Sequence, residues 1–408
     1  MSRRGLLKTA GGLSTALLLG GTAAAPASAG TSARKAPSAW THPGMLHNAG
    51  DIARAKAGVA AGSDPWLAGW NRLTANPHAR STWTPRPQAT VVRGGTGQNY
   101  GILYNDIHAA YQNALCWHIG GSEAHAQCAA RILNAWSSTL TAVTGNADRF
   151  LAAGIYGWQF ANAAELMRTY PAFDLARFRR MMADVFYPLN NQFLTGHNDA
   201  CVTNYWANWD LCTMASVLAI GILDEDPAKY DQAVTYFRTG AGNGSVRNAV
   251  PFLHHGVEGH DLGLGQWQES GRDQGHSVMG MGQMGAVCEM AWNQGEDLYS
   301  YDDRRFLKAA QYVARYNLGL DVPFTAYTWG SGQNCSRQTH TVISSASRGQ
   351  IRPVWAMLHH HYNRRLRLDD EYIARMYSSI APEGGGGDYG PNSGGYDQLG
   401  FGTLMYAA

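Results

Sequence analysis

The sequence is poor in charge and lacks the common motifs of nucleotide and cofactor enzymes. Only 15% of its residues are Asp, Glu, Lys or Arg, and the formal net charge is +2 at pH 7. A balance this close to neutral excludes a strongly basic nucleic-acid-binding protein, and no basic run with interleaved aromatic residues occurs. The sequence also contains no Walker loop, no G-x-S-x-G elbow and no G-x-G-x-x-G between a strand and a helix.

Long apolar runs are absent as well. No segment beyond the N-terminus reaches the roughly eighteen apolar residues of a membrane span, so we expect no membrane association of the mature protein. The N-terminus instead predicts an export signal, with Arg3-Arg4, an apolar run over Leu13–Leu19 and small residues up to Ala29. Paired arginines are typical of twin-arginine signals. We expect a secreted, extracellular protein with a signal at 1–29, a linker at 30–43 and one domain at 44–408.

Metal-binding motifs are missing too. The six cysteines have no C-x-x-C spacing, and in an exported protein they predict one to three disulfides of unknown pairing, with buried free thiols as the alternative. Histidines cluster at His254, His255 and His260 and again at 359–361, yet neither cluster contains H-E-x-x-H. We therefore expect no metal and no cofactor.

Helices dominate the predicted secondary structure. Strand-like alternation is confined to short runs such as 322–329 and 338–343. Two long Gly-rich segments, Gly240–Gly275 and Glu383–Tyr396, interrupt the helices, and loops of this length are usually functional. Stacked helical hairpins closed into a ring bury their apolar faces, so the predicted fold class is all-α: an (α/α) toroid in a single domain, with the Gly-rich loops over a groove. Helical spacing of apolar residues predicts helices at 106–118, 122–140, 150–170, 174–186, 206–222, 227–237, 276–292, 302–318 and 351–362.

Aromatic residues are abundant, with 13 Trp and 20 Tyr. A flat aromatic ring packs against the C–H face of a sugar ring, so this surplus suits a groove for a polysaccharide. Large helical folds also bury tryptophan in their cores, and composition leaves both interpretations open.

The densest polar cluster is the segment Gln266–His276, just before an apolar helical segment. Arg272 and His276 stand four residues apart, which places them on one face if the helix begins by Asp273. An arginine binds a carboxylate through two hydrogen bonds, and a histidine exchanges protons near neutral pH. The pair therefore suits a reaction on a uronic acid. The alternative is a helix cap with a solvated arginine and a core histidine.

A second polar cluster, Thr203–Asp210, opens another helical segment. Asn204 and Asn208 share one helical face, and Tyr205 and Trp209 share the next. Amides flanked by aromatic rings suit sugar binding. The alternative is a capping asparagine with core aromatic rings, although Asn208 lies beyond the first turn, where asparagine has poor helix propensity.

Three motifs carry a family resemblance: Glu269–His276, Arg348–Trp355 and Pro382–Phe401. With them the chain resembles the alginate-lyase superfamily, most closely polysaccharide lyase family 38 and more distantly family 5. The resemblance covers most of the chain from Asn105 onward. It implies an (α/α) toroid and β-elimination on alginate or a related polyuronate such as glucuronan.

The resemblance also implies residue roles. Family 5 enzymes carry an Asn-His pair on one helix and an Arg with a Tyr near the start of a later helix. Asn208 matches that asparagine, but Trp209 stands where the family has histidine. His276 falls near the family's tyrosine position, with Arg272 nearby. We therefore assign proton abstraction to His276 and neutralisation of the substrate carboxylate to Arg272 and Asn208.

β-Elimination further requires an acid that protonates the departing O4, a role often taken by tyrosine in such lyases. We choose Tyr327, which follows a helix in an aromatic loop; Tyr205, Tyr362 and Tyr389 are the alternatives. His255 is a candidate for a second base or a substrate contact. The full set of expected substrate contacts is His255, Asn204, Tyr205, Trp209, Gln268, Glu269, Arg348 and Tyr389.

Two other functions fit the sequence. Glu269, Asp273, Glu383 and Asp388 are candidates for the carboxylate pair of a glycoside hydrolase acting on an acidic polysaccharide, with Glu269 and Asp273 favoured. A groove rich in aromatic rings also suits a polysaccharide-binding protein without turnover. We favour the lyase. Its expected partner is an acidic polysaccharide, with no nucleic acid and no membrane, and we expect a monomer.

Overall fold

The computed structural model describes residues 37, 39–257, 262–389 and 395–408. The predicted export signal, most of the predicted linker and His260 lie outside these residues. The described residues between Pro37 and Ala408 form one compact unit. No helix in the described part of the chain is long and apolar enough to cross a membrane.

Every predicted helix is present, some of them divided by π-helical turns. Further helices precede, extend or follow the predicted ones. In chain order the main helical elements are α1 (Ala49–Ala60), α2 (Trp66–Thr74), η1 (Pro77–Ala79), α3 (Tyr100–Gly120), α4 (Glu123–Thr139), α5 (Asp148–Leu151), η2 (Ala152–Tyr156), α6 (Gly157–Leu166), α7 (Leu175–Met181), η3 (Met182–Phe186), α8 (Tyr187–Gly196), η4 (His197–Asp199), α9 (Ala207–Asp224), α10 (Pro227–Thr239), α11 (Val246–Ala249), η5 (Gln268–Gly271), α12 (Gln274–Asn293), α13 (Tyr301–Asn317), α14 (Trp355–His359), η6 (His360–Arg365), α15 (Glu371–Ile380) and α16 (Gly402–Tyr406).

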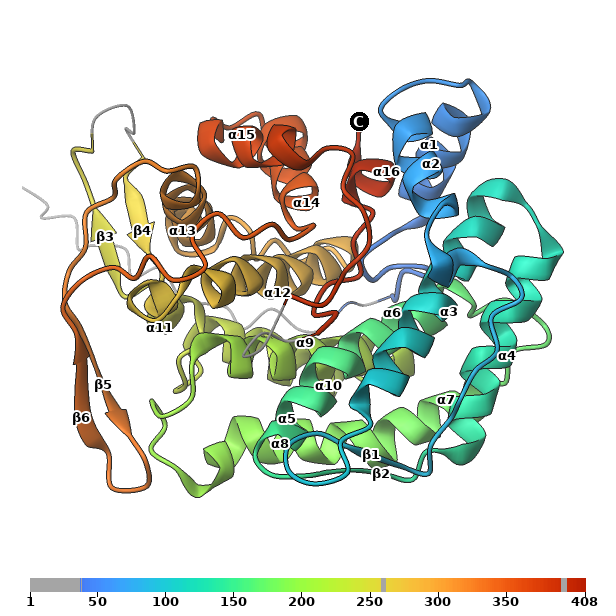
Figure 1. Ribbon diagram of the computed structural model, residues 1–408, viewed down its shortest axis with the longest axis horizontal. Coiled ribbons are helices and arrows are strands. Elements are labelled where there is room, and N and C mark those ends of the chain that lie inside the picture. Colours follow the sequence, from blue (N-terminus) through green and yellow to red (C-terminus); the bar gives the residue numbers. More distant parts are fainter. Residues whose placement is uncertain (1–36, 38, 258–261, 390–394) are drawn as a thin grey trace, which may run out of the picture. The chain divides into compact units, whose positions relative to one another are not determined.

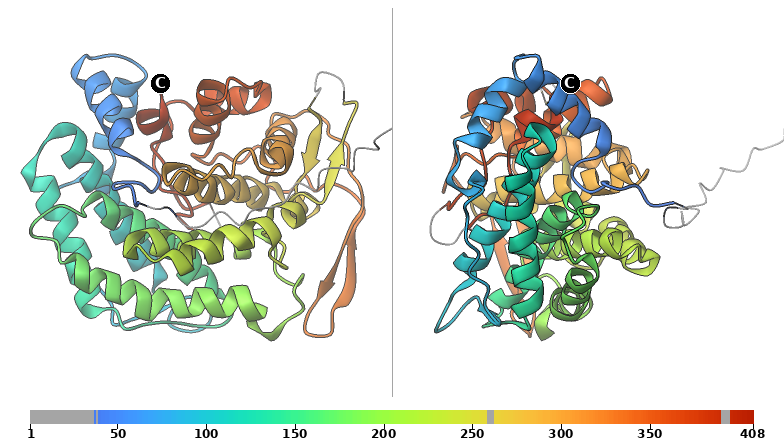
Figure 2. Two further views of the ribbon diagram at one scale, coloured as in Figure 1. Left: turned by 180° about the vertical axis from the view of Figure 1, so that it is seen from behind. Right: turned by 90° about the vertical axis from the view of Figure 1, so that its right-hand side faces the viewer.

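Helices α9 and α12 form the centre of this unit. Almost all of their residues are buried, as expected for helices that are surrounded by other helices. Helix α9 packs against α6, α8, α10 and α12, and α12 also contacts α13 and α14. Figures 1 and 2 show the two helices side by side, with the other helical hairpins around them. Both begin on the same side of the molecule, which brings the two polar clusters of the sequence together.

The described residues include three pairs of short strands, of which the sequence indicated only the third. Parallel β1 (Thr90–Val92) and β2 (Ala142–Thr144) pair through Val91 and Val143. Antiparallel β3 (Phe252–His254) and β4 (Leu264–Gln266) lie inside the first Gly-rich segment, which is therefore not a single loop. Its buried Leu264 and Trp267 attach it to the core. The third pair, β5 (Tyr327–Ser331) and β6 (Ser336–His340), forms a hairpin close to the runs predicted as strand-like.

One disulfide, Cys201–Cys335, joins the loop before α9 to the β5–β6 hairpin. The other four cysteines are buried free thiols. The prediction of at least one disulfide is therefore confirmed for Cys201 and Cys335, and the alternative of buried free thiols holds for the other four cysteines.

The C-terminal segment is held by two buried acids. Asp397 pairs with Arg352, and both side chains are fully buried. Glu383 accepts hydrogen bonds of 2.8 Å from the backbone N–H groups of Trp355 and Ala356 at the start of α14. Burial raises the pKa of Glu383 to about 8, although the two backbone hydrogen bonds act to lower it.

We expect Glu383 to make stability pH-dependent. The folded protein holds this proton more tightly than the unfolded chain, whose glutamate titrates near its ordinary value of 4.5. The contribution to stability is therefore complete at acid pH and is lost as pH rises toward 8, by at most about 1.4 kcal/mol per pH unit. The Glu383→Gln variant keeps a side-chain oxygen that can accept the two backbone hydrogen bonds, but it has no group that titrates in this pH range. Denaturant unfolding at pH 5 and pH 8 should show a smaller decline for this variant than for the wild type, and equal declines would contradict the prediction.

Candidate active site

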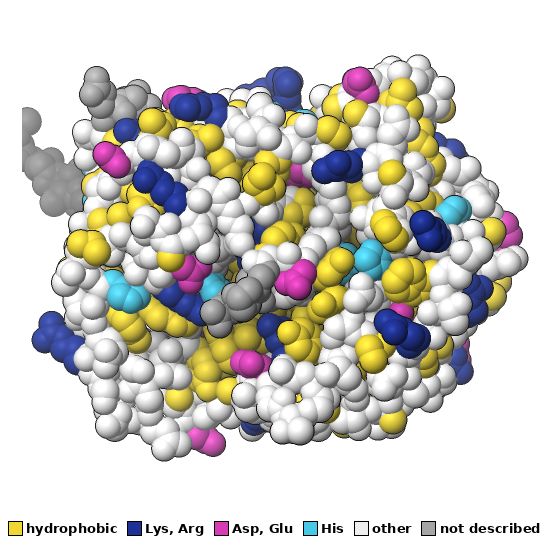
Figure 3. Space-filling view, in the orientation of Figure 1, with side chains coloured by type: hydrophobic (Ala, Val, Ile, Leu, Met, Phe, Trp, Pro, Cys, Tyr) yellow, Lys and Arg dark blue, Asp and Glu magenta, His cyan; other side chains and the backbone are white. Residues whose placement is uncertain are grey.

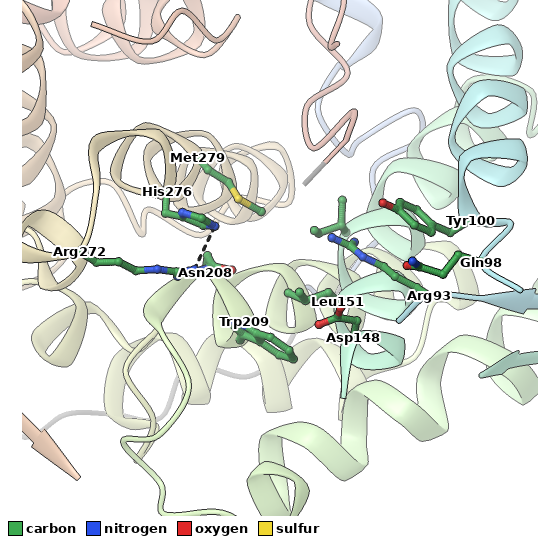
Figure 4. A pocket seen from close by; sticks show the side chains of 11 residues that line it. Arg93, Gln98, Tyr100, Asp148, Leu151, Asn208, Trp209, Arg272, His276 and Met279 are labelled. Carbon is green, nitrogen blue, oxygen red and sulfur yellow. Dashed lines mark hydrogen bonds between the residues drawn. The ribbon is translucent and has the colours of Figure 1, made fainter. Parts of the chain in front are cut away.

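A cavity of about 300 Å³ opens where α9 and α12 begin. Figure 3 shows a hollow in the middle of this face, with basic, acidic and histidine side chains around it. The start of α9 and the start of α12 form one wall, and α5, η2 and the segment between β1 and α3 form the other (Figure 4). Its lining residues are Arg93, Gln98, Tyr100, Asp148, Leu151, Ile155, Asn208, Trp209, Arg272, His276 and Met279.

His276 is fixed in one orientation by Asp273, which caps α12. The Asp273 carboxylate accepts hydrogen bonds of 2.7 Å from both the backbone N–H and the imidazole Nδ1 of His276. Burial raises the pKa of Asp273, but the hydrogen bonds from His276 and the Arg272 charge outweigh it and hold that pKa below its ordinary value. Because the carboxylate only accepts, Nδ1 carries the ring proton and Nε2 of the neutral ring is an acceptor.

Arg272 stands beside the free nitrogen of this histidine. Its Nη2 donates to His276 Nε2 at 3.3 Å, and its Nη1 donates to Glu269 at 2.9 Å. Glu269 is fully buried and also accepts two hydrogen bonds, of 2.9 and 3.0 Å, from the Asn208 side-chain amide. One buried carboxylate therefore positions both the arginine and the asparagine that border the cavity.

Aromatic rings support Arg272 from the outer side. Its guanidinium lies 5.1 Å from the ring centroid of Trp206. Trp206 stacks in parallel with His340 and contacts Trp329, both from the β5–β6 hairpin. Burial, and to a smaller degree the Arg272 charge, lowers the pKa of His340, which favours the neutral ring. The disulfide-linked hairpin thus contacts the site through Trp206.

The comparisons with known proteins point to one family. The Alginate lyase family model matches residues 96–321, more than half of the chain and both polar clusters. The chain belongs to the alginate lyase family. It is accordingly a polysaccharide lyase, as predicted.

Solved structures of alginate lyase A1-III share the fold. A variant complexed with a tetrasaccharide is 16% identical, with a TM-score of 0.56 over 80% of this chain and 88% of that one. The enzyme from Sphingomonas species A1 is 15% identical, with a TM-score of 0.55 over 90% and 96%. No curated protein sequence matches the chain. The predicted (α/α) toroid is confirmed.

The lyase cavity contains four of the predicted residues. His276, Arg272, Asn208 and Trp209 all line it. Asn208 and Trp209 lie at the start of α9, and some sixty residues later Arg272 precedes α12 and His276 lies in its first turn. Gln268 and Glu269 lie behind it, fully enclosed, and hold the start of α9 through the backbone N–H groups of Ala207 and Asn208.

Tyr327 lies outside the cavity. Its hydroxyl accepts from Gln268 and donates to Asn243, each at 3.2 Å. Burial raises the pKa of Tyr327. Tyr327 thus joins β5 to η5 and does not line this cavity.

The remaining predicted contacts also have other surroundings. Asn204 accepts from the backbone of Gly332, and Tyr205 packs on Trp209. The other three lie away from the cavity lining: Arg348 donates to carbonyls at the end of α13, Tyr389 lies under Arg352, and His255 is exposed beyond β3.

The opposite wall was not found from the sequence. Arg93, Gln98 and Tyr100 lie between β1 and the first turn of α3, and Asp148 begins α5. The available signal was a third glycine-rich stretch, Arg93–Tyr100, which contains a cation and a tyrosine beside three glycines. In the described part of the chain no cluster of histidine, cysteine and acidic side chains could hold a metal ion.

Proposed function

We propose that this lyase cleaves a polyuronate, alginate or glucuronan, by β-elimination and leaves an unsaturated uronate at the new non-reducing end. The observation that carries the proposal is the His276 imidazole. It lines the cavity with Nδ1 bound to Asp273 and with Nε2 facing the Arg272 guanidinium. A base and a carboxylate-binding cation in contact are what removal of a proton next to a carboxylate requires.

The first step is abstraction of the C5 proton. The resulting enediolate-like intermediate is tolerated only if the charge of the adjacent carboxylate is offset, a role we give to Arg272 and Asn208. A carboxylate is a stronger partner for a guanidinium than an imidazole is. Its arrival draws Arg272 away from His276 Nε2, which is then free to accept the proton. The electrons of the C5–H bond form the C4=C5 double bond as the C4–O4 bond breaks.

The departing O4 takes a proton from an acid, for which we propose Tyr100. It is the tyrosine among the cavity-lining residues, and it lies on the wall opposite His276 (Figure 4). Base and acid on facing walls place a sugar between them, so that the proton at C5 and the oxygen at C4 are reached from different sides.

Three of the carboxylates predicted for a hydrolase, Glu269, Asp273 and Glu383, are not placed for that reaction. Glu269 is fully buried and bound by Asn208 and Arg272, and Asp273 is engaged by His276. Neither carboxyl group is therefore available to protonate a glycosidic oxygen. Glu383 is buried behind α14, away from the cavity.

The direct test is ultraviolet absorbance of the purified protein with polymannuronate, polyguluronate and glucuronan, each incubated separately. We expect absorbance from the C4=C5 bond to rise with one of these polymers, in step with new reducing ends. Reducing ends without absorbance would indicate a hydrolase. If neither signal changes, the protein either acts on a different polymer or binds a polysaccharide without cleaving it.

We also propose that the enzyme is exported through its Arg3-Arg4 signal. The Cys201–Cys335 disulfide supports this, since disulfides persist in oxidising environments outside the cytoplasm. A polysaccharide too large to enter a cell also requires an external enzyme. Replacement of both arginines by lysine should retain the precursor inside the cell, detected by immunoblot of cell and medium fractions.

A further inference from the structure

Arg93 is a buried cation that faces the lyase cavity. It directly follows β1, and its backbone N–H donates to the Thr144 carbonyl at 3.0 Å. Only 7% of the residue is exposed, and its guanidinium points into the cavity from the wall opposite Arg272 (Figure 4). Its position is therefore set by the strand pairing rather than by a flexible loop.

The Arg93 guanidinium lacks an ionic partner among the described residues. Its hydrogen bonding there consists of one long contact, 3.5 Å to the Tyr156 hydroxyl. The rings of Tyr100 and Tyr156 lie 4.9 and 5.6 Å from it. A guanidinium has five N–H donors, and a buried charge is costly unless it is paired and hydrogen-bonded.

The nearby acids do not supply that partner. Asp397 is engaged by Arg352, and no ion pair joins Arg93 to Asp148, the acidic side chain of the cavity lining. By contrast, Arg272 on the other wall is paired with Glu269. The unmet donors of Arg93 thus point to an anion that arrives from outside.

We propose that Arg93 binds the carboxylate of a second uronate, next to the one whose C5 proton is removed. The inference rests on the proposed function. In a run of uronates every sugar carries a carboxylate, so one chain can engage Arg272 on one wall and Arg93 on the other. A polymer in which uronates alternate with neutral sugars engages only one of them. The enzyme is therefore specific for consecutive uronates.

Binding tests this without turnover. The probes are tetrasaccharides of mannuronate, guluronate and glucuronate, titrated calorimetrically into the His276→Ala protein with and without Arg93→Ala. Loss of a charged hydrogen-bonding partner should weaken binding of the preferred tetrasaccharide about 10- to 100-fold. Arg93→Lys should recover part of the loss, because it keeps the charge without the planar fork. Arg149→Ala, outside the cavity lining, is the matched control and should bind normally.

A purely structural arginine predicts a different result. Its removal would lower the melting temperature and leave affinity unchanged among the folded molecules, which overturns the proposal. We expect an unchanged or higher melting temperature, because an unpaired buried charge is removed.

A second measurement uses the polymer that the wild type cleaves, with about half of its carboxyl groups randomly reduced to alcohols. An enzyme that needs two adjacent carboxylates should lose about four-fold in kcat/KM, and Arg93→Ala only about two-fold. Equal losses would refute the second carboxylate site. If no tetrasaccharide binds even to His276→Ala, this proposal and the proposed function both fail, whereas binding without any cleavage by the wild type removes only the function.

Discussion

His276→Ala should lower kcat about 10²- to 10⁴-fold, the range typical of a general base. The imidazole lies on the cavity wall, so its loss opens space toward solvent and leaves the packing of α12 intact. Ultraviolet absorbance at saturating polymer gives kcat, and circular dichroism checks the fold. KM should change little, because Arg272 and Asn208 still hold the substrate carboxylate.

A matched control is His125→Ala, which removes a half-buried histidine of α4 that lies outside the cavity. It should leave kcat unchanged. Asp273→Asn provides a second comparison: the base remains, but the acceptor that fixes its Nδ1–H tautomer is weakened. Wild-type turnover by His276→Ala would overturn the assignment of the base, whatever the behaviour of the other variants.

Asp397→Ala should give the largest loss of stability among single substitutions in the C-terminal segment. Asp397 and Arg352 are both fully enclosed, and Arg352 also donates to the Gly275 carbonyl at 2.6 Å. Removing Asp397 leaves the buried Arg352 charge without its carboxylate partner and costs about 3–5 kcal/mol. Denaturant unfolding measures this cost directly. The loss should also lower activity, because Gly275 immediately precedes His276.

The control is a charge-free pair, Arg352→Met with Asp397→Leu. Because both charges are removed together, the double variant should recover most of the stability lost by Asp397→Ala. If the single variant unfolds at the same denaturant concentration as the wild type, the ion pair does not anchor the C-terminal segment.

Most of the fold was predictable because its helices follow a regular apolar spacing. The sequence did not show that α9 and α12 are central, because both carry polar residues among the apolar ones and their burial depends on the surrounding helices. The small strands were missed because each contains only three residues, as in β1 and β2, too short for an alternation to show. The pairing of β1 with β2 also joins segments about fifty residues apart, and local pattern does not carry that information.

The sequence predicted one wall of the cavity and missed the other. The sequence predicted that Arg272 and His276 share a helical face. In the structure α12 begins at Gln274 and Asp273 is extended, so Arg272 precedes the helix, yet its side chain still reaches His276 at 3.3 Å. Sequence spacing did not reveal the positions of Tyr327 and Arg93. Whether a tyrosine faces a cavity or a buried amide depends on which element packs beside it, and a lone arginine before a glycine-rich stretch has no periodicity to mark it.

The π-helical turn η2 allows the cavity wall to accept the deletion of one residue. A π turn contains one more residue than the α-helical turn it replaces, and such bulges frequently occur at functional sites. It carries Ile155 into the cavity lining and Tyr156 to Arg93, between the regular helices α5 and α6. Deleting one residue here can return the segment to a continuous α-helix without displacing α6. Relatives of different length can therefore remodel this wall within a helix, where loops normally provide such variation.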